Sequence, residues 1–277
     1  MATEVRLTET SIKRLTNAYW LARKSRFLDT VLGQRAFSAC YFLYKRYLED
    51  PYHDLVEQHP ELFRGGNILD IGANIGYTAT VFSRRVDSEY KVYAFEPERF
   101  NYDLLERAAR ARKSRQRVVP IRSAVGDRDG AIELWENEHH HGDHRILTEQ
   151  FRQNAASSDT FMVPIMQVDT FVAKQPGNFP VRFIKVDVQG YELPVCWGME
   201  HTLTVNTRAI VALEYMPSAI RELGFQPEEL LIWFRRRGYQ VYRIERRGRL
   251  RPGFGDISGR LTYCDLLFSR EDLTAPA

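Results

Sequence analysis

The chain has 277 residues, of which 44% are hydrophobic and 27% charged, with a net charge of only +3. This is an ordinary globular composition, so collagen-like, low-complexity and disordered chains are excluded. A charge so close to neutrality also argues against a dedicated nucleic-acid-binding protein. The longest apolar stretch, residues 36–44, falls far short of the roughly 20 residues that a membrane helix needs.

Two further features bear on the compartment. The N-terminal sequence has no apolar signal core, which predicts a cytoplasmic protein. Cys40, Cys196 and Cys264 lie far apart with no CxxC spacing, so we interpret them as buried thiols rather than as disulfide or zinc ligands.

The first 66 residues are predicted to form a helical extension. Apolar side chains recur at helical spacing over residues 11–32 and again over 37–48, where Pro51 ends the helix. Residues 53–63 add a short helix. No chemistry is visible in this part, which we interpret as a lid or a packing layer.

Residues 67–277 show short apolar runs alternating with amphipathic segments, which predicts a second, catalytic or binding domain. The expected strands are 68–71, 91–95, 118–121, 181–186, 209–213, 240–244 and 261–268, and the first helices are 76–85 and 99–112. Strands separated by helices of this length predict a parallel sheet covered on both faces. The turn-rich residues 248–259 make the last two strands a hairpin, so one strand should be antiparallel.

One region, about residues 131–168, interrupts this rhythm between the third and fourth parallel strands. Residues 131–135 and 161–168 are strand-like and flank a polar stretch that contains His139, His140, His141 and His144. We expect the three consecutive histidines to be a polar loop. An insertion over the carboxyl ends of a parallel sheet is a usual place for substrate recognition.

The most informative segment is LDIGANIG at residues 69–76, which leaves a buried strand and enters a helix. Gly72 and Gly76 let the backbone turn tightly and approach a ligand, and Ala73 and Asn74 lie between them. The GxGxxG spacing of dinucleotide enzymes is missing. Asp70 ahead of the first glycine would repel a diphosphate but can orient an ammonium, which favours S-adenosylmethionine over NAD.

A carboxylate at the end of the second strand strengthens this interpretation. Glu96 can accept both hydroxyl hydrogen bonds of a ribose, although a surface acid at a strand end is the simpler alternative. Ala124 and Asp127 follow the third strand. We expect them to border the base, with Asp127 accepting from an exocyclic amine.

At this point the sequence resembles the FkbM-type S-adenosylmethionine-dependent methyltransferases over roughly residues 62–214. The resemblance rests on residues 69–76, 94–97, 168–170 and 184–192. It implies a Rossmann-like α/β class I methyltransferase, with a seven-stranded, mostly parallel sheet whose last strand is antiparallel. By the resemblance, the cofactor site would be lined by Asp70, Gly72, Asn74, Gly76 and Glu96. Members of the family methylate mostly hydroxyls, and sometimes amides, on sugars, lipids, secondary metabolites and peptides.

Methylation of an alcohol also needs a group that takes up its proton. Asp187 follows the fourth strand, Glu192 opens the next helix, Glu214 ends the fifth strand, and His144 lies on the insertion. We expect His144 or Asp187 to be the general base, with Glu192 and Glu214 orienting the acceptor. Alternatively, Asp187 holds the cofactor ammonium and Glu192 only complements a helix dipole. The family usually has an acid where Gln189 stands, so that carboxylate is missing here.

The same residues also allow other ligands and functions. Asp187 and Glu214 with a histidine could hold a divalent cation, although the Asp-Asn pair of catechol O-methyltransferases is absent. A non-catalytic nucleoside-binding regulatory or scaffold protein, N-methylation of an amide or peptide, and a dehydrogenase are the alternative functions. Our expectation is O-methylation of a small-molecule, saccharide or lipid-linked acceptor.

An arginine-rich stretch between residues 235 and 251 holds eight arginines and a single acid, Glu245. The simpler reading is a solvated surface. The other is a docking face for an anionic substrate or for peripheral contact with a membrane.

Overall fold

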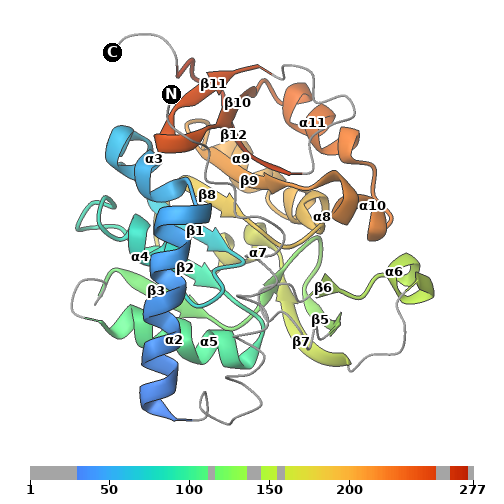
Figure 1. The fold of residues 1–277 in the computed structure, drawn as a ribbon. Helices are drawn as coiled ribbons and strands as arrows, with labels where there is room; N and C mark the ends of the chain where they lie inside the picture. Colours follow the sequence, from blue (N-terminus) through green and yellow to red (C-terminus); the bar gives the residue numbers. More distant parts are fainter. Residues whose placement is uncertain (1–29, 112–115, 136–144, 155–159, 254–262, 274–277) are drawn as a thin grey trace, which may run out of the picture.

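The computed structural model describes residues 30–111, 116–135, 145–154, 160–253 and 263–273. Its centre is a sheet of strand order β11-β10-β12-β9-β8-β1-β2-β3 (Figure 1). The strands are β1 (Asn67–Ile71), β2 (Val92–Phe95), β3 (Val118–Ile121), β8 (Val181–Val186), β9 (Ile210–Tyr215), β10 (Gln240–Ile244), β11 (Leu250–Pro252) and β12 (Cys264–Ser269). Neighbours from β3 to β9 are parallel, whereas β12 runs antiparallel between β9 and β10. The predicted fold class is confirmed.

The sheet has one strand more than the seven that were predicted. β11 pairs antiparallel with β10 at the edge of the sheet. The chain can reverse there because Arg247 and Gly248 both adopt positive φ angles, 59° and 70°. The turn reverses the chain soon after β10 ends, so residues 250–252 lie beside β10 as β11.

Both faces of the central sheet are covered, and β1 and β8 are buried along their whole length. The elements against one face are α3 (Tyr52–Gln58), the 3₁₀ turn η3 (Pro60–Phe63), α4 (Tyr77–Phe82) and α5 (Arg99–Arg110). Those against the other are α7 (Val168–Ala173), α8 (Glu192–Trp197), α9 (Glu200–Val205), α10 (Pro217–Glu222) and α11 (Pro227–Arg236). Two helical layers explain why the central strands are continuous apolar runs rather than alternating ones.

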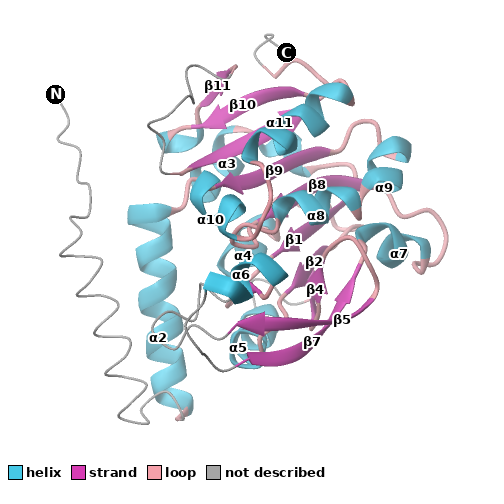
Figure 2. Ribbon diagram, turned by 90° about the vertical axis from the view of Figure 1, so that its right-hand side faces the viewer, coloured by secondary structure: helices cyan, strands magenta, loops and turns pink. Residues whose placement is uncertain are grey.

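The insertion forms a second sheet beside the first (Figure 2). Its order is β4-β7-β5-β6, with β4 (Ala124–Val125), β5 (Gly130–Trp135), β6 (Arg145–Ile146), β7 (Thr160–Met166) and the helix α6 (Glu149–Asn154). β5 and β7 pair antiparallel from Gly130↔Ile165 to Trp135↔Thr160. The predicted strand 161–168 is too long, because Val168 already begins α7.

The N-terminal part differs from its prediction. Residues 31–44 form one continuous helix, α2 (Val31–Tyr44), which runs on as the π-helical turn η2 (Lys45–Glu49) and joins the two predicted ranges 11–32 and 37–48. Thr30 caps the start of the helix, and its hydroxyl accepts from the Gly33 amide at 3.0 Å. Most of the predicted helix 11–32 lies outside the described residues.

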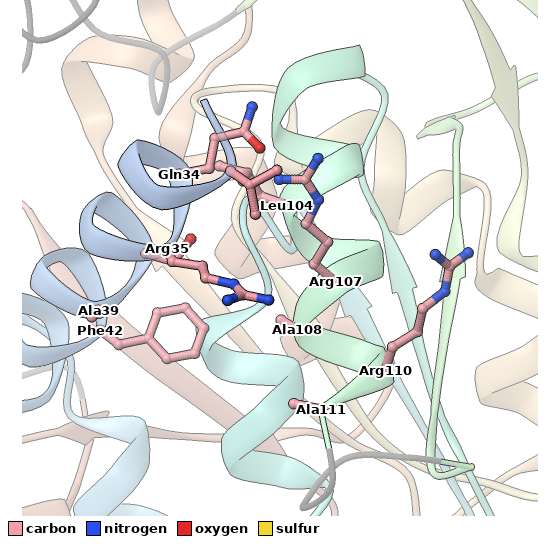
Figure 3. A pocket seen from close by; sticks show the side chains of 11 residues that line it. Gln34, Arg35, Ala39, Phe42, Leu104, Arg107, Ala108, Arg110 and Ala111 are labelled. Atoms are coloured by element: carbon pink, nitrogen blue, oxygen red, sulfur yellow. The ribbon is translucent and has the colours of Figure 1, made fainter. Parts of the chain in front are cut away.

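The exposure of α2 also corrects the reading of one cysteine. Cys196 and Cys264 are buried free thiols as expected, but Cys40 is exposed on α2. An open cavity of ≈ 550 Å³ separates α2 from α5 (Figure 3), lined by Phe42 and Leu104 among others. No candidate site residue that the structure describes lines it. In the part of the chain that the structure describes, no helix combines the length and apolarity that crossing a membrane requires.

Candidate active site

The glycine loop is shaped by close contacts within the protein. Gly72 has a φ of +75°, and a Cβ there would lie 1.8 Å from the Asp187 carbonyl oxygen. Gly76 has a φ of +89°, and its Cβ would lie 2.8 Å from Leu105 Cδ1. Asn74 is also left-handed, with a φ of 49°, and its Oδ1 accepts from the following amide. These glycines therefore bring the loop after β1 against the end of β8 and against α5.

Glu96 lies at this loop, as predicted, at the carboxyl end of β2. Its Oε2 accepts from the Asn74 amide at 2.9 Å and its Oε1 from the Glu98 amide at 3.0 Å. The amide of Ala73, which is itself buried, donates to the Phe95 carbonyl at 2.9 Å. Burial raises the pKa of Glu96 to about 8, against the stabilising backbone amides. The carboxylate faces backbone donors and has no nearby ion-pair partner among the described residues.

Asp70 is fully buried beneath the loop. Its Oδ2 accepts from the Thr78 hydroxyl at 2.7 Å, and Lys185 Nζ lies 3.6 Å from its Oδ1. Burial raises the pKa of Asp70, while Lys185 and Thr78 oppose the shift. Because Asp70 is 0% exposed, its predicted direct contact with a ligand ammonium would require the groups that cover it to move.

Asp187 occupies the end of β8, next to the glycine loop. Its Oδ2 accepts from Lys185 Nζ at 3.1 Å and its Oδ1 from Gln189 Nε2 at 3.0 Å. Burial acts to raise the pKa of Asp187, but Lys185 and the Gln189 amide outweigh it and lower that pKa. The side chain is 27% exposed. Asp187 is therefore an ionised carboxylate that a ligand can reach.

The same Gln189 amide links Asp187 to Glu214, because Nε2 also donates to Glu214 Oε2 at 3.0 Å. Burial raises the pKa of Glu214 well above its usual range, and Asp187 and Asp265 add to the shift. The two carboxylates that were predicted from separate strands are thus joined, and their pKa values move in opposite directions. Asp187 is the one that keeps its charge.

Two further residues of this cluster were missed by the sequence reasoning. Asp265 on β12 pairs in register with Glu214, and the Tyr52 hydroxyl donates to Asp265 Oδ1 at 3.4 Å. Burial raises the pKa of Asp265 to about 7, helped by Asp50 and Asp187. An acid in the otherwise apolar run 264–268 was the available signal. Nothing in the sequence marked Tyr52, which brings the N-terminal helices to the site.

Glu192 has a local task that the sequence did not reveal. It is 1% exposed, and its Oε1 accepts from the Val188 amide at 3.3 Å and the Gly190 amide at 3.1 Å. Gln189 between them has a φ of 55°. Burial raises the pKa of Glu192 to about 7. The carboxylate thereby supports the loop that presents Gln189, and its predicted contact with an acceptor stays a prediction.

The remaining candidates fall into two groups. Ala124 is buried in β4, and the Asp127 carboxylate accepts from the Tyr191 hydroxyl at 3.3 Å, so their predicted contact with a base stays untested. His144 and the preceding histidines lie outside the described residues. Among the residues that the structure does describe, no group of three His, Cys, Asp or Glu side chains is arranged to hold a metal. A divalent cation therefore gains no support here.

The arginine-rich stretch is engaged in surface contacts. The Arg237 guanidinium lies 3.9 Å from the centre of the Trp233 ring, and Arg249 pairs with Glu245 at 2.6 Å. Exposed pairs of this kind contribute little to stability. The docking reading of this stretch stays untested.

Comparison with known proteins gives the family of the chain. The family model described as "Methyltransferase FkbM domain" matches residues 70–241, more than half of the chain. The chain is 24% identical over 203 residues to methyltransferase sdnD of Sordaria araneosa, covering 65% of this chain and 76% of that protein. It is 30% identical over 149 residues to hexuronic acid methyltransferase AglP of Haloferax volcanii, covering 53% and 55%.

A solved structure, methyltransferase FkbM from Methylobacillus flagellatus KT, is 18% identical with a TM-score of 0.49. The match covers 83% of this chain and 50% of that one, so the chain spans about half the length of this relative and of the archaeal one. The family match carries the assignment, because it includes the glycine loop, Glu96 and the segment from Lys185 to Glu192. The chain belongs to the FkbM methyltransferase domain family.

Proposed function

We propose that the chain is an S-adenosylmethionine-dependent methyltransferase that methylates a hydroxyl of a saccharide, a glycolipid or a secondary metabolite. The observation that carries the proposal is the ionised, partly exposed Asp187, held directly against the glycine loop. A donor-binding loop and a proton acceptor thus lie side by side at the carboxyl ends of two central strands, β1 and β8. Methyl transfer to an alcohol needs this combination.

The residues at the loop fit the cofactor. Glu96 would accept from the ribose hydroxyls, since its carboxylate oxygens already face backbone donors beside the loop and retain free lone pairs. The amides of residues 72–76 would surround the amino-acid part, with Asp187 as an alternative partner of its ammonium. When bound, the cofactor supplies a methyl group that leaves a sulfonium sulfur for the acceptor oxygen.

Asp187 and its neighbours would handle the acceptor. As the hydroxyl O–H bond breaks, its proton goes to the Asp187 carboxylate, whose two oxygens are held by Lys185 and Gln189 but retain lone pairs. Glu214 and Asp265 would hold neighbouring hydroxyls of the acceptor. His144 stays the alternative base from the insertion.

Asp187, Glu214 and Asp265 form an acidic row that also narrows the class of acceptor. The ionised Asp187 would repel a carboxylate, and the carboxyl groups of Glu214 and Asp265 beside it suit a face rich in hydroxyls. The name of the archaeal relative supports a saccharide acceptor. That name is of an acidic sugar, so the preference for a neutral face at the site of transfer rests on the charge of Asp187 alone. The predicted cytoplasmic location stays a prediction.

Calorimetry and a transfer assay test the proposal together. S-adenosylhomocysteine should bind and NAD should not, and labelled methyl from the donor should appear as an ether on a neutral glycoside. Binding of NAD without binding of S-adenosylhomocysteine would refute the proposed methyltransferase activity. Label found only on nitrogen, across a panel with glycosides and amide peptides, would replace the hydroxyl acceptor by an amide. S-adenosylhomocysteine binding without turnover on any member would favour the non-catalytic alternative.

A further inference from the structure

A lysine is buried in the middle of the site. The Lys185 side chain is only 4% exposed on β8, where charged side chains are seldom found without partners. Its Nζ donates to Asp187 Oδ2 at 3.1 Å and to the Gly72 carbonyl at 3.1 Å, and lies 3.6 Å from Asp70 Oδ1. The ammonium therefore donates two hydrogen bonds, one to a backbone carbonyl and one to a carboxylate, and lies close to a second carboxylate.

These three partners belong to the two halves of the reaction. Asp70 and Gly72 belong to β1 and the donor loop, whereas Asp187 is the proton acceptor of the proposed function. The donor loop is also in close backbone contact with the end of β8, because there is no room for a Cβ on Gly72 beside the Asp187 carbonyl. Lys185 thus adds a charged link at a point of backbone contact.

We propose that Lys185 is a positioning residue for methyl transfer, which fixes the Asp187 side chain to the donor loop. The inference rests on the proposed function in that Asp187 is taken as the proton acceptor. Lys185 itself touches neither donor nor acceptor in this account. It acts through Asp187, whose other oxygen is held by Gln189.

The surrounding charges explain why a cation is needed there. The charged and titratable groups that act on Asp187 or belong to its cluster are Lys185, Asp70, Glu192, Glu214, Asp265, Asp50, Tyr52 and Lys45. Acids dominate this set, so removal of Lys185 should let Asp187 bind a proton at higher pH. Activity that requires the ionised carboxylate would then be lost from the acid side.

The test replaces the ammonium by an apolar chain of similar length. For Lys185→Met we expect kcat to fall about 100-fold, since the proton acceptor loses its fixed position. The acid limb of the kcat profile should move to higher pH. The dissociation constant of S-adenosylhomocysteine should change by no more than about threefold. A carboxyl ¹³C NMR titration should show a raised pKa for Asp187, a readout that needs no turnover.

Two further variants keep the test decisive if Lys185→Met fails to fold or acts only through the loss of a buried cation. Lys185→Met leaves Asp70 buried without its cation, which can prevent folding. Asp70→Asn with Lys185→Met removes that charge and should still raise the pKa of Asp187. Arg182→Met is the matched control, since Arg182 is a buried cation at the other end of β8 that donates to the carbonyls of Arg208 and Glu61. It should lower the melting temperature and leave the pH profile in place.

The outcomes separate the two claims. A folded Lys185→Met or double variant with kcat within about threefold and an unmoved pH profile would overturn the inference. So would an unchanged Asp187 titration. A wild-type protein that methylates no acceptor would refute the proposed function, whereas a raised Asp187 pKa in the variant would still support the role of Lys185 in holding that carboxylate ionised.

Discussion

The two halves of the candidate site are built by different means. The donor half, residues 70–76 with Glu96, comes from one short stretch of chain and consists largely of backbone amides and turns. The acceptor half gathers side chains of Tyr52, Asp187, Glu214 and Asp265 from four distant segments. The first depends on backbone conformation and the second on electrostatic balance among carboxylates. They meet where Gly72 and Lys185 contact Asp187.

The largest expected effect separates the halves by function. Asp187→Asn should lower kcat by about 10²–10⁴-fold, because an amide cannot take the acceptor proton. S-adenosylhomocysteine affinity, measured by calorimetry, should hardly change. Asp103→Asn is the control, since its carboxylate pairs with Arg99 on the surface of α5 and is 41% exposed. If Asp187→Asn instead lost cofactor affinity and kept kcat, Asp187 would belong to the donor half.

A substitution at the junction should disturb both halves. Gly72→Ala combines a φ of +75° with a Cβ 1.8 Å from the Asp187 carbonyl, so we expect a loss of about 3 kcal/mol in the free energy of unfolding. Urea unfolding measures it. Gly177→Ala, with a φ of +70° and nothing within 4 Å, should cost about 1 kcal/mol for conformation alone. Equal losses in the two variants would show that the backbone contact carries no energy.

The smallest effect concerns pH and the donor half. Since burial raises the pKa of Glu96 to about 8, the free protein holds it mostly protonated at pH 6.5. Ribose hydroxyls favour the ionised form, so S-adenosylhomocysteine should bind about 30-fold more tightly at pH 9 than at pH 6.5 and release a proton. Calorimetry in buffers of different ionisation enthalpy measures both.

Glu96→Gln provides the comparison for this pH effect. The variant should bind weakly at all pH values and lose the pH dependence. Glu192 and Asp265, whose pKa values are raised to about 7, also titrate in this range. An unchanged pH dependence in Glu96→Gln would assign the effect to one of them.

Much of the fold was predictable because its signals are local. Apolar runs bounded by turns located β1, β3 and β8 within a residue or two, and the final hairpin located the antiparallel strand. The errors have physical causes. β11 depends on a turn at two positive-φ residues, and Cys40 is exposed because it lies on α2, a helix in which Gly33 is the buried residue. The proposed boundary at residue 66 stays a prediction, and Tyr52 ties the preceding helices to the site.

The sequence alone located the glycine loop and Glu96, because a strand, a glycine turn and a carboxylate at the next strand end follow one another closely along the chain. It also placed Asp187 and Glu214 at the carboxyl ends of their strands, β8 and β9. The tertiary structure decided which charges neighbour one another: that Lys185 lies under Asp187, that Gln189 bridges two acids, and that Asp265 and Tyr52 complete the row. Such contacts depend on strand order and register, and the protonation state of each carboxylate follows from them.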